Sequence, residues 1–160
     1  MSNFDRLGGW PEYLWDLENS HIVYTRRLGY PRPSYTTISH TWGRSVLPGP
    51  GREIPGGFPY PIHPNSAFEP STLPGTLKIL QGKISSSFLW IDILCIPQGD
   101  EEYMSEDDKK LRLREIGRQR EIFENATSSI AWLHDVDDLS CLAEVFRWLC
   151  VSIFEVKGDI

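Results

Sequence analysis

The pattern of apolar and polar positions first predicts a β-hairpin and a core strand near the start of the chain. Tyr13–Asp16 and His21–Tyr24 are short apolar-rich runs, and Leu17–Ser20 between them ends in Asn and Ser, which suit a turn. Tyr35–Ser39 is a β-branched run of the kind that favours a strand. We therefore expect a hairpin that leads into the first strand of the core.

Two later apolar runs predict further strands. Phe88–Ile96 is almost continuously apolar, as is typical of a strand that is covered on both faces. Ser129–His134 predicts one more strand. Between Phe88–Ile96 and the first core strand, residues 44–75 hold eight of the twelve prolines and five of the thirteen glycines. Such a density predicts a long irregular loop.

Apolar residues at spacings of three and four predict three helices. These are a short helix over Thr76–Ile84, a longer one over Lys109–Asn125 that Ser105 caps, and a last one over Leu139–Phe154. The apolar face of the second helix is expected to carry Leu113, Ile116 and Phe123.

The alternation of strands and helices predicts an α/β fold with a doubly wound parallel sheet and flanking helices. Residues 1–34 are expected to form a hairpin lead-in within the same domain as residues 35–160. A sheet of this kind has five strands, whereas the chain after the hairpin supplies three. Either the hairpin and the proline- and glycine-rich loop fill the gap, or the chain is a piece of a longer protein.

Composition and charge narrow the function classes. The chain has 160 residues, the size of one domain, and 40% hydrophobic content, which excludes a disordered chain. A net charge of −6 argues against nucleic acid as the main partner, and no apolar run is long enough to span a membrane. Three cysteines without a C-x-x-C motif indicate a reduced, cytoplasmic protein. Four scattered histidines predict no metal site.

Three sequence motifs follow one another along the chain: Tyr35–Gly43 (YTTISHTWG), Leu89–Gln98 (LWIDILCIPQ) and Gln119–Ala126 (QREIFENA), the last continued by Ala131–Leu133 (AWL). They resemble the Y-x-x-L-S-H-x-W-G, W-I-D-x-x-C-I-x-Q and Q-x-x-x-M-x-x-I-Y-x-x-A…W-L-G motifs of the HET (heterokaryon incompatibility) domain of filamentous fungi. The departures from that pattern are Ile38, Pro97, Phe123 and His134.

HET domains are in turn similar to TIR domains, which have a flavodoxin-like fold. Ser140–Val145 (SCLAEV) is similar to the TIR segment whose Glu is catalytic in the TIR enzymes that cleave NAD. The resemblance implies a TIR-like fold, NAD+ or a related nucleotide as substrate with no separate cofactor, and Glu144 as the catalytic residue. It also implies that Pro97–Asp108 corresponds to a TIR loop that joins subunits, so that self-association is expected.

The chemistry of NAD+ cleavage suggests where the remaining site residues lie. A carboxylate must stabilise the oxocarbenium-like ribosyl centre, and backbone N–H groups can hold the diphosphate. In an open α/β sheet ligands bind beyond the carboxyl ends of the strands. We therefore expect the nucleotide to contact Ser39, His40, Trp42, Gly43, Arg44, Asp92, Cys95 and Gln98.

Other interpretations of these residues stay open at this point. Glu144 lies opposite the apolar stripe of its predicted helix, which is also where an ordinary solvated glutamate lies. Asp92 has a structural alternative, in which it hydrogen-bonds nearby loop N–H groups, and Trp90 has a packing role. His40 and Cys95 could form the base and nucleophile of a hydrolase. The functional alternative is a non-catalytic, self-associating signalling module that triggers incompatibility cell death when an attached or separate recognition domain activates it.

Overall fold

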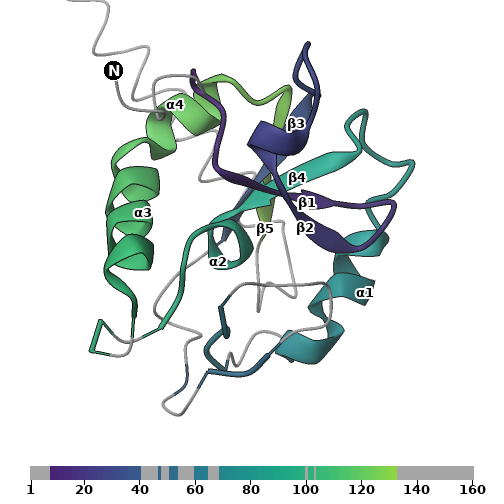
Figure 1. Ribbon diagram of the computed structural model, residues 1–160. Helices are drawn as coiled ribbons and strands as arrows, with labels where there is room; N and C mark the ends of the chain where they lie inside the picture. Colours follow the sequence, from purple (N-terminus) through teal and green to yellow (C-terminus); the bar gives the residue numbers. More distant parts are fainter. Residues whose placement is uncertain are drawn as a thin grey trace, which may run out of the picture.

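A mixed five-stranded sheet with the strand order β2-β1-β4-β3-β5 forms the centre of the fold (Figure 1). The structure is a computed structural model and describes residues 8–40, 47, 51–53, 60–64, 69–99, 101–102 and 104–132. β3 runs parallel to β4 and to β5, whereas β1 is antiparallel to β2 and to β4. The strands are β1 (Tyr13–Asp16), β2 (His21–Tyr24), β3 (Tyr35–His40), β4 (Phe88–Ile91) and β5 (Ser128–Trp132).

The predicted N-terminal hairpin is present and is part of the sheet. Its turn is stabilised by Asp16, whose carboxylate accepts hydrogen bonds from the backbone N–H groups of Glu18 (2.9 Å) and Asn19 (3.0 Å). β1 then pairs with β4, with Trp15 opposite Leu89. The hairpin therefore contributes two of the five strands, and the parallel sheet that the sequence predicts comprises only β3, β4 and β5.

The apolar run Phe88–Ile96 is not one strand, which corrects the prediction. β4 ends at Ile91, and the single-turn helix α2 follows over Asp92–Cys95. The Oδ1 atom of Asp92 accepts a hydrogen bond from the N–H of Ile93 (2.8 Å), and its charge suits the positive end of the helix. Residues 91–98 are all buried. The end of the strand and the helical turn are therefore both continuously apolar, and the periodicity of the sequence does not show where one ends and the other begins.

The first helix lies earlier than predicted. Residues 70–75, which the sequence pattern places in the irregular loop, instead form the 3-10 turn η3 (Pro70–Thr72) and the start of helix α1 (Leu73–Lys78). Pro74 is tolerated because a proline in the first helical turn removes no intrahelical hydrogen bond. Buried Leu73 and Leu77, four residues apart, fix α1 against the core.

The predicted helix over Lys109–Asn125 is two helices, α3 (Glu106–Gly117) and α4 (Gln119–Glu124), which lie together at one side of the molecule while α1 lies at the other (Figure 1). Ser105 caps α3 as predicted, since its hydroxyl accepts a hydrogen bond from the N–H of Asp108 (3.1 Å). The predicted apolar face is confirmed for Phe123, which packs against the core, and is wrong for the two residues on α3. Leu113 and Ile116 are 71% and 47% exposed, whereas Glu115 is fully buried.

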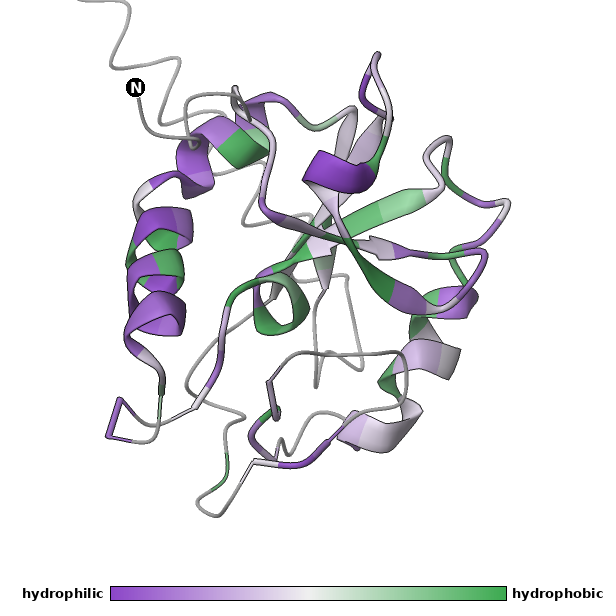
Figure 2. Cartoon of the chain, viewed as in Figure 1, coloured by the Kyte–Doolittle hydropathy of each residue, from purple (hydrophilic) through white to green (hydrophobic). Residues whose placement is uncertain are grey.

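The hydrophobic core lies around β1, β4 and α2, where the hydrophobic colour concentrates along β4 and α2 (Figure 2). Trp15 and Trp90 are its largest fully buried side chains, and the ring of Phe123 packs edge-on against Trp90 at 5.6 Å. In the described ranges no helix is both long and apolar enough to cross a bilayer. The helix predicted over residues 139–154 lies outside the described residues.

Candidate functional site

The carboxyl ends of β3, β4 and β5 meet at one edge of the sheet because these strands are parallel. Ile38 lies opposite Ile91, and His40 lies opposite Trp132. Of the residues predicted to bind a nucleotide, the structure brings Ser39, His40 and Asp92 to this edge, with Ser39 exposed. Four predicted site residues lie outside the described part of the chain: Trp42, Gly43, Arg44 and Glu144.

Asp92 begins α2 directly after β4. Its side chain is buried, with 9% of the residue exposed, and its hydrogen bond to the N–H of Ile93 anchors the first turn of α2. The structural hydrogen bond that the sequence allowed for Asp92 is therefore present. The residue lies in a single-turn helix rather than inside the strand that the apolar run predicts.

Gln98 is buried under the same turn. Its Nε2 group donates hydrogen bonds to the backbone carbonyls of Ile96 (2.7 Å) and Asp92 (3.2 Å). The hydroxyl of Tyr60 donates to the carbonyl of Leu94 (2.7 Å). The carbonyl of Asp92 already accepts a hydrogen bond from the N–H of Ile96 (2.9 Å), and Gln98 adds a second one there, while Tyr60 and Gln98 supply partners for the carbonyls of Leu94 and Ile96 at the end of the turn. The geometry therefore gives Gln98 a positioning role at this edge.

Cys95 is a free cysteine and is fully buried. Burial raises the pKa of its thiol well above the ordinary range, so the thiolate needed for nucleophilic attack is disfavoured. This environment supports the interpretation of Cys95 as a small hydrophobic side chain and gives no support to a nucleophile–base pair with His40.

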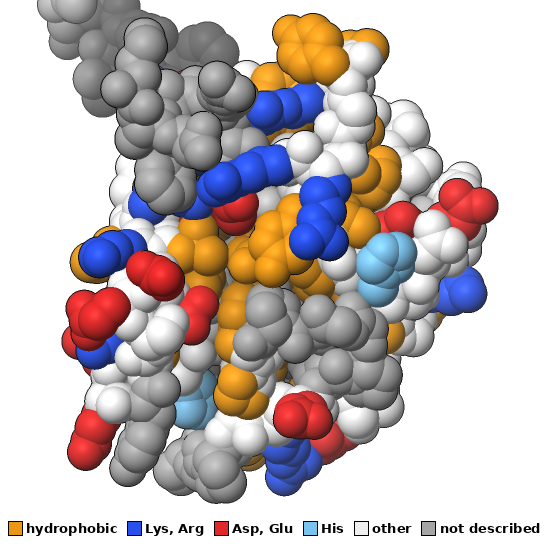
Figure 3. Space-filling model, viewed as in Figure 1, with side chains coloured by type: hydrophobic (Ala, Val, Ile, Leu, Met, Phe, Trp, Pro, Cys, Tyr) orange, Lys and Arg blue, Asp and Glu red, His pale blue; other side chains and the backbone are white. Residues whose placement is uncertain are grey.

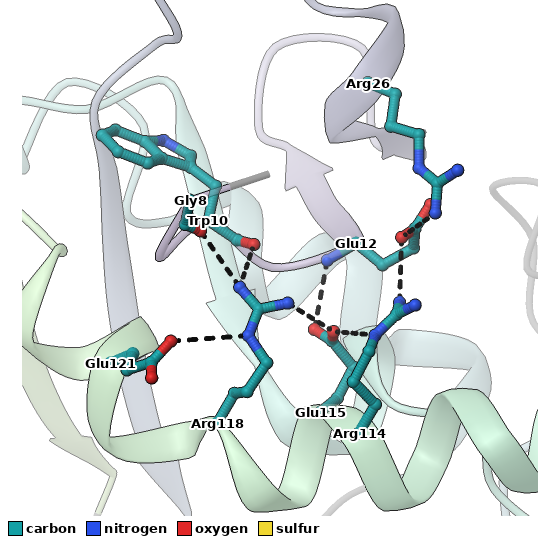
Figure 4. Close-up of polar contacts among 8 residues, drawn as sticks. All are labelled: Gly8, Trp10, Glu12, Arg26, Arg114, Glu115, Arg118 and Glu121. Atoms are coloured by element: carbon teal, nitrogen blue, oxygen red, sulfur yellow. Dashed lines mark hydrogen bonds and ion pairs between the residues drawn. The ribbon is translucent and has the colours of Figure 1, made fainter. Parts of the chain in front are cut away.

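A cluster of buried and half-buried charges that the sequence did not reveal connects α3 to the start of β1 (Figure 4). The carboxylate of Glu12 accepts hydrogen bonds from Arg26 (2.6 Å) and Arg114 (2.9 Å). The backbone N–H of Glu12 in turn donates to the carboxylate of Glu115 (3.1 Å), which also contacts Arg114 (3.3 Å) and Arg118 (3.5 Å). The only local signal for this cluster is the three-residue spacing of Glu115 and Arg118.

Burial dominates the electrostatics of Glu115. It raises the pKa of this carboxyl above its usual range, while the N–H of Glu12 and the guanidinium groups of Arg114 and Arg118 act in the opposite direction. Arg118 also donates to the backbone carbonyls of Gly8 (3.1 Å) and Trp10 (3.0 Å). The cluster thus links the chain segment before β1 to α3, a structural rather than a catalytic arrangement.

Among the residues that the structure describes, no three His, Cys, Asp or Glu side chains are grouped as a metal site would need.

The comparisons with known proteins gave one finding. The family model described as heterokaryon incompatibility protein (HET) matches residues 35–149. No curated protein and no solved structure matched the chain.

Proposed function

Because the chain belongs to the heterokaryon incompatibility (HET) family, we propose that it acts in fungal incompatibility cell death by hydrolysing NAD+ to nicotinamide and ADP-ribose in the cytoplasm. The observation that supports this proposal most directly is the order of the parallel strands. β3, the first of them along the chain, lies between β4 and β5. The first three strands of a flavodoxin-like, and hence TIR-like, sheet have this order.

In such a sheet the ligand crevice opens beyond the carboxyl ends of the strands, where the strand order reverses. For this chain that point is between β3 and β5. Ser39 and His40 end β3, and Trp42, Gly43 and Arg44 follow directly in the sequence. We assign these five residues to nucleotide binding. Asp92 and Gln98, through the hydrogen bonds described above, would hold the neighbouring α2 turn in position, and Cys95 is the buried last residue of that turn.

The proposed reaction breaks the glycosidic bond between ribose C1 and the nicotinamide nitrogen. Nicotinamide leaves with the bonding electron pair, and water adds to C1 and releases a proton. The carboxylate of Glu144 would stabilise the positive charge that develops on the ribose in the transition state. The indole of Trp42 would stack on one of the rings of the nucleotide.

The test is to incubate the purified chain with NAD+ at high protein concentration, with and without a crowding agent, and to follow nicotinamide release. We expect release by the wild type and a loss of at least about 100-fold in Glu144→Gln, since removal of one charge-stabilising group commonly costs this much. Glu18→Gln, which changes an exposed carboxylate at the hairpin turn in the same way, is the matched control. Absence of release under all conditions would refute the enzyme, and full release by Glu144→Gln would refute the site.

The alternative function is a non-catalytic module that self-associates to transmit a cell-death signal. The exposed apolar pair Leu113 and Ile116 on α3 favours it, because two neighbouring large apolar side chains on one helix face suit a contact with a second copy. Sedimentation of the wild type and of the double variant Leu113→Ser/Ile116→Ser tests this function. Self-association that the double variant abolishes, without nicotinamide release by either protein, would support the alternative.

A further inference from the structure

A groove of about 410 Å³ lies between α3 and the segment that runs from the start of β1 to the 3-10 turn η2 (Thr25–Arg27). This volume is in the range of sites that bury a ligand or an anchoring side chain. None of the nucleotide contacts proposed above lies in it. The groove is lined by Glu12, Tyr13, Arg26, Asp107, Lys110, Leu111 and Arg114.

The charge of the groove is positive although the whole chain carries −6. The lining cations are Arg26, Lys110 and Arg114, and the lining carboxylates are those of Glu12 and Asp107, while the buried carboxylate of Glu115 contacts Arg114 from outside the lining. The Glu12 side chain is 7% exposed and contacts both Arg26 and Arg114, so it is covered by its cationic partners. An approaching ligand therefore meets mainly cations. This favours an anionic ligand.

The two guanidinium groups are held in place before any ligand arrives. The carboxylate of Glu12 bridges Arg26 and Arg114, and the carboxylate of Glu115 is a second partner of Arg114. The side chains of Arg26 and Arg114 nevertheless keep 41% and 21% of their surface exposed. Because these side chains are already ordered, binding an anion costs little further side-chain entropy.

The rim and floor of the groove add aromatic and apolar surface. Tyr13 and Leu111 line it, and the ring of Tyr13 lies 4.9 Å from that of Tyr24. Arg27, exposed on η2 and next to Arg26 in the sequence, lies over the Tyr24 ring at 4.7 Å. Figure 3 shows hydrophobic side chains between a group of acidic and basic side chains at the left of the view and further Lys or Arg side chains nearer the middle. Tyrosine and arginine are the residues enriched where proteins bind one another.

We propose that this groove is a docking site for an acidic peptide segment of a partner protein, in which one apolar side chain is flanked by carboxylates. The apolar side chain would rest on Tyr13 and Leu111. The carboxylates would face Arg26, Arg27 and Lys110. A small carboxylate alone would use only part of this surface, and a basic segment would be repelled.

The test uses the full chain and a fluorescein-labelled Glu-Glu-Leu-Glu-Glu peptide, with Glu-Glu-Ser-Glu-Glu and free glutamate as comparison ligands. Fluorescence polarisation measures affinity, and backbone amide chemical shifts locate the binding surface. We expect chemical-shift changes at the groove residues and an affinity for the peptide that falls as the salt concentration rises. The charge reversals Arg27→Glu and Lys110→Glu should each weaken binding at least about fivefold, because they place like charges opposite each other. Lys83→Glu, a reversal at an exposed lysine outside the groove, should have no effect.

Several outcomes would overturn the proposal. No binding of the Leu-containing peptide at millimolar concentration would do so, as would shifts confined to other surfaces. Equal binding of the Ser-containing peptide or of free glutamate would show a small-anion site in place of a peptide site. If Lys83→Glu weakened binding as much as Lys110→Glu, the attraction would come from overall charge and not from this groove.

Discussion

At the scale of single residues, Glu115 determines how α3 meets the start of the sheet. A fully buried carboxylate is costly unless it is paired, and here the N–H of Glu12 and two arginines satisfy it. The sequence analysis predicts the opposite orientation, because it assigns Leu113 and Ile116 to the buried face of the helix, whereas Leu111 is the apolar residue of α3 that packs against the core. Sequence patterns report hydrophobicity, whereas this contact depends on partners about 100 positions away.

We predict that Glu115→Ala lowers the free energy of unfolding by about 3 kcal/mol, since it removes one partner from a buried charge cluster. Urea denaturation measures this change. Glu121→Ala is the control, because Glu121 contacts Arg118 at 3.6 Å with 60% of its side chain exposed, and its loss should cost less than about 1 kcal/mol. Equal losses in the two variants would contradict the role assigned to Glu115.

Asp16 gives a pH-dependent prediction. Burial acts to raise the pKa of its carboxyl, but hydrogen bonds from the Asn19 side chain and the backbone of Asn19 and Glu18 outweigh it, and the pKa lies below the ordinary value. The folded state therefore prefers the charged form. The resulting stability is present above the pKa of the unfolded chain, about 3.9, and is lost as pH falls through the lower folded-state pKa.

Asp16→Asn should accordingly reduce stability by roughly 1 kcal/mol at pH 7, since it replaces charge-assisted hydrogen bonds by neutral ones. The difference from the wild type should shrink when denaturation is repeated at about pH 3. Glu18→Gln, at an exposed side chain beside it, should change stability little at either pH. If Asp16→Asn lowered the free energy of unfolding by the same amount at pH 7 and pH 3, the charge of Asp16 would be excluded as the cause.

At the scale of elements, the existence of the strands was predictable, and so were the bounds of the hairpin strands, whereas the end of β4 was not. The hairpin, β3 and β5 occur where the apolar patterns predict them. Phe88–Ile96 was assigned wholly to a strand because a buried strand and a buried helical turn are both continuously apolar. The structure distinguishes the two, because the N–H of Ile96 bonds to the carbonyl of Asp92 (2.9 Å) and the side chains of Asp92, Tyr60 and Gln98 hydrogen-bond around this turn.

The same scale gives a prediction for the two helices that the sequence treats as one. Ile122→Ala in α4 should cost about 2–4 kcal/mol, because Ile122 is fully buried and its truncation leaves a cavity. Ile116→Ala in α3 removes the same atoms from a residue that is 47% exposed and should cost less than about 1 kcal/mol. Chemical denaturation compares them. A larger loss of stability in Ile116→Ala than in Ile122→Ala would instead support the buried face that the sequence predicts.

At the scale of the whole molecule, the hairpin is part of the core although the family match begins at residue 35. Leu14 and Trp15 are fully buried, and β1 pairs with β4 in the middle of the sheet. Tyr35, at the start of β3, sits under Trp10 with ring centroids 6.3 Å apart. Residues 8–34 therefore cover apolar surface that residues 35–132 would otherwise expose to water.

We predict that residues 35–160 produced without the hairpin do not fold. Losing two buried side chains of this size, together with the partners of Glu115, removes several kcal/mol, which is most of the stability of a small domain. Amide spectra of the truncated and full chains provide the measurement, and we expect the truncated chain to lose the dispersed peaks of a folded protein. A well-dispersed spectrum from residues 35–160 would show that the hairpin is dispensable.

The sequence by itself determined the α/β class, the hairpin, the three parallel strands and the HET family, because these depend on local apolar patterns and on motifs that lie close together in the chain. Of the candidate site, the sequence predicts that Ser39 and His40 lie at the carboxyl end of a strand, but it places Asp92 inside a strand, whereas Asp92 follows β4 directly and begins α2. Only the tertiary structure decided that Asp92 and Gln98 hydrogen-bond the α2 turn, that the hairpin joins the sheet, and that Glu115 is the buried residue of α3. Each of these features is a hydrogen bond, a strand pairing or an ion pair between residues that are distant in the sequence or buried by distant segments. Such contacts depend on how the whole chain packs and not on the local sequence pattern.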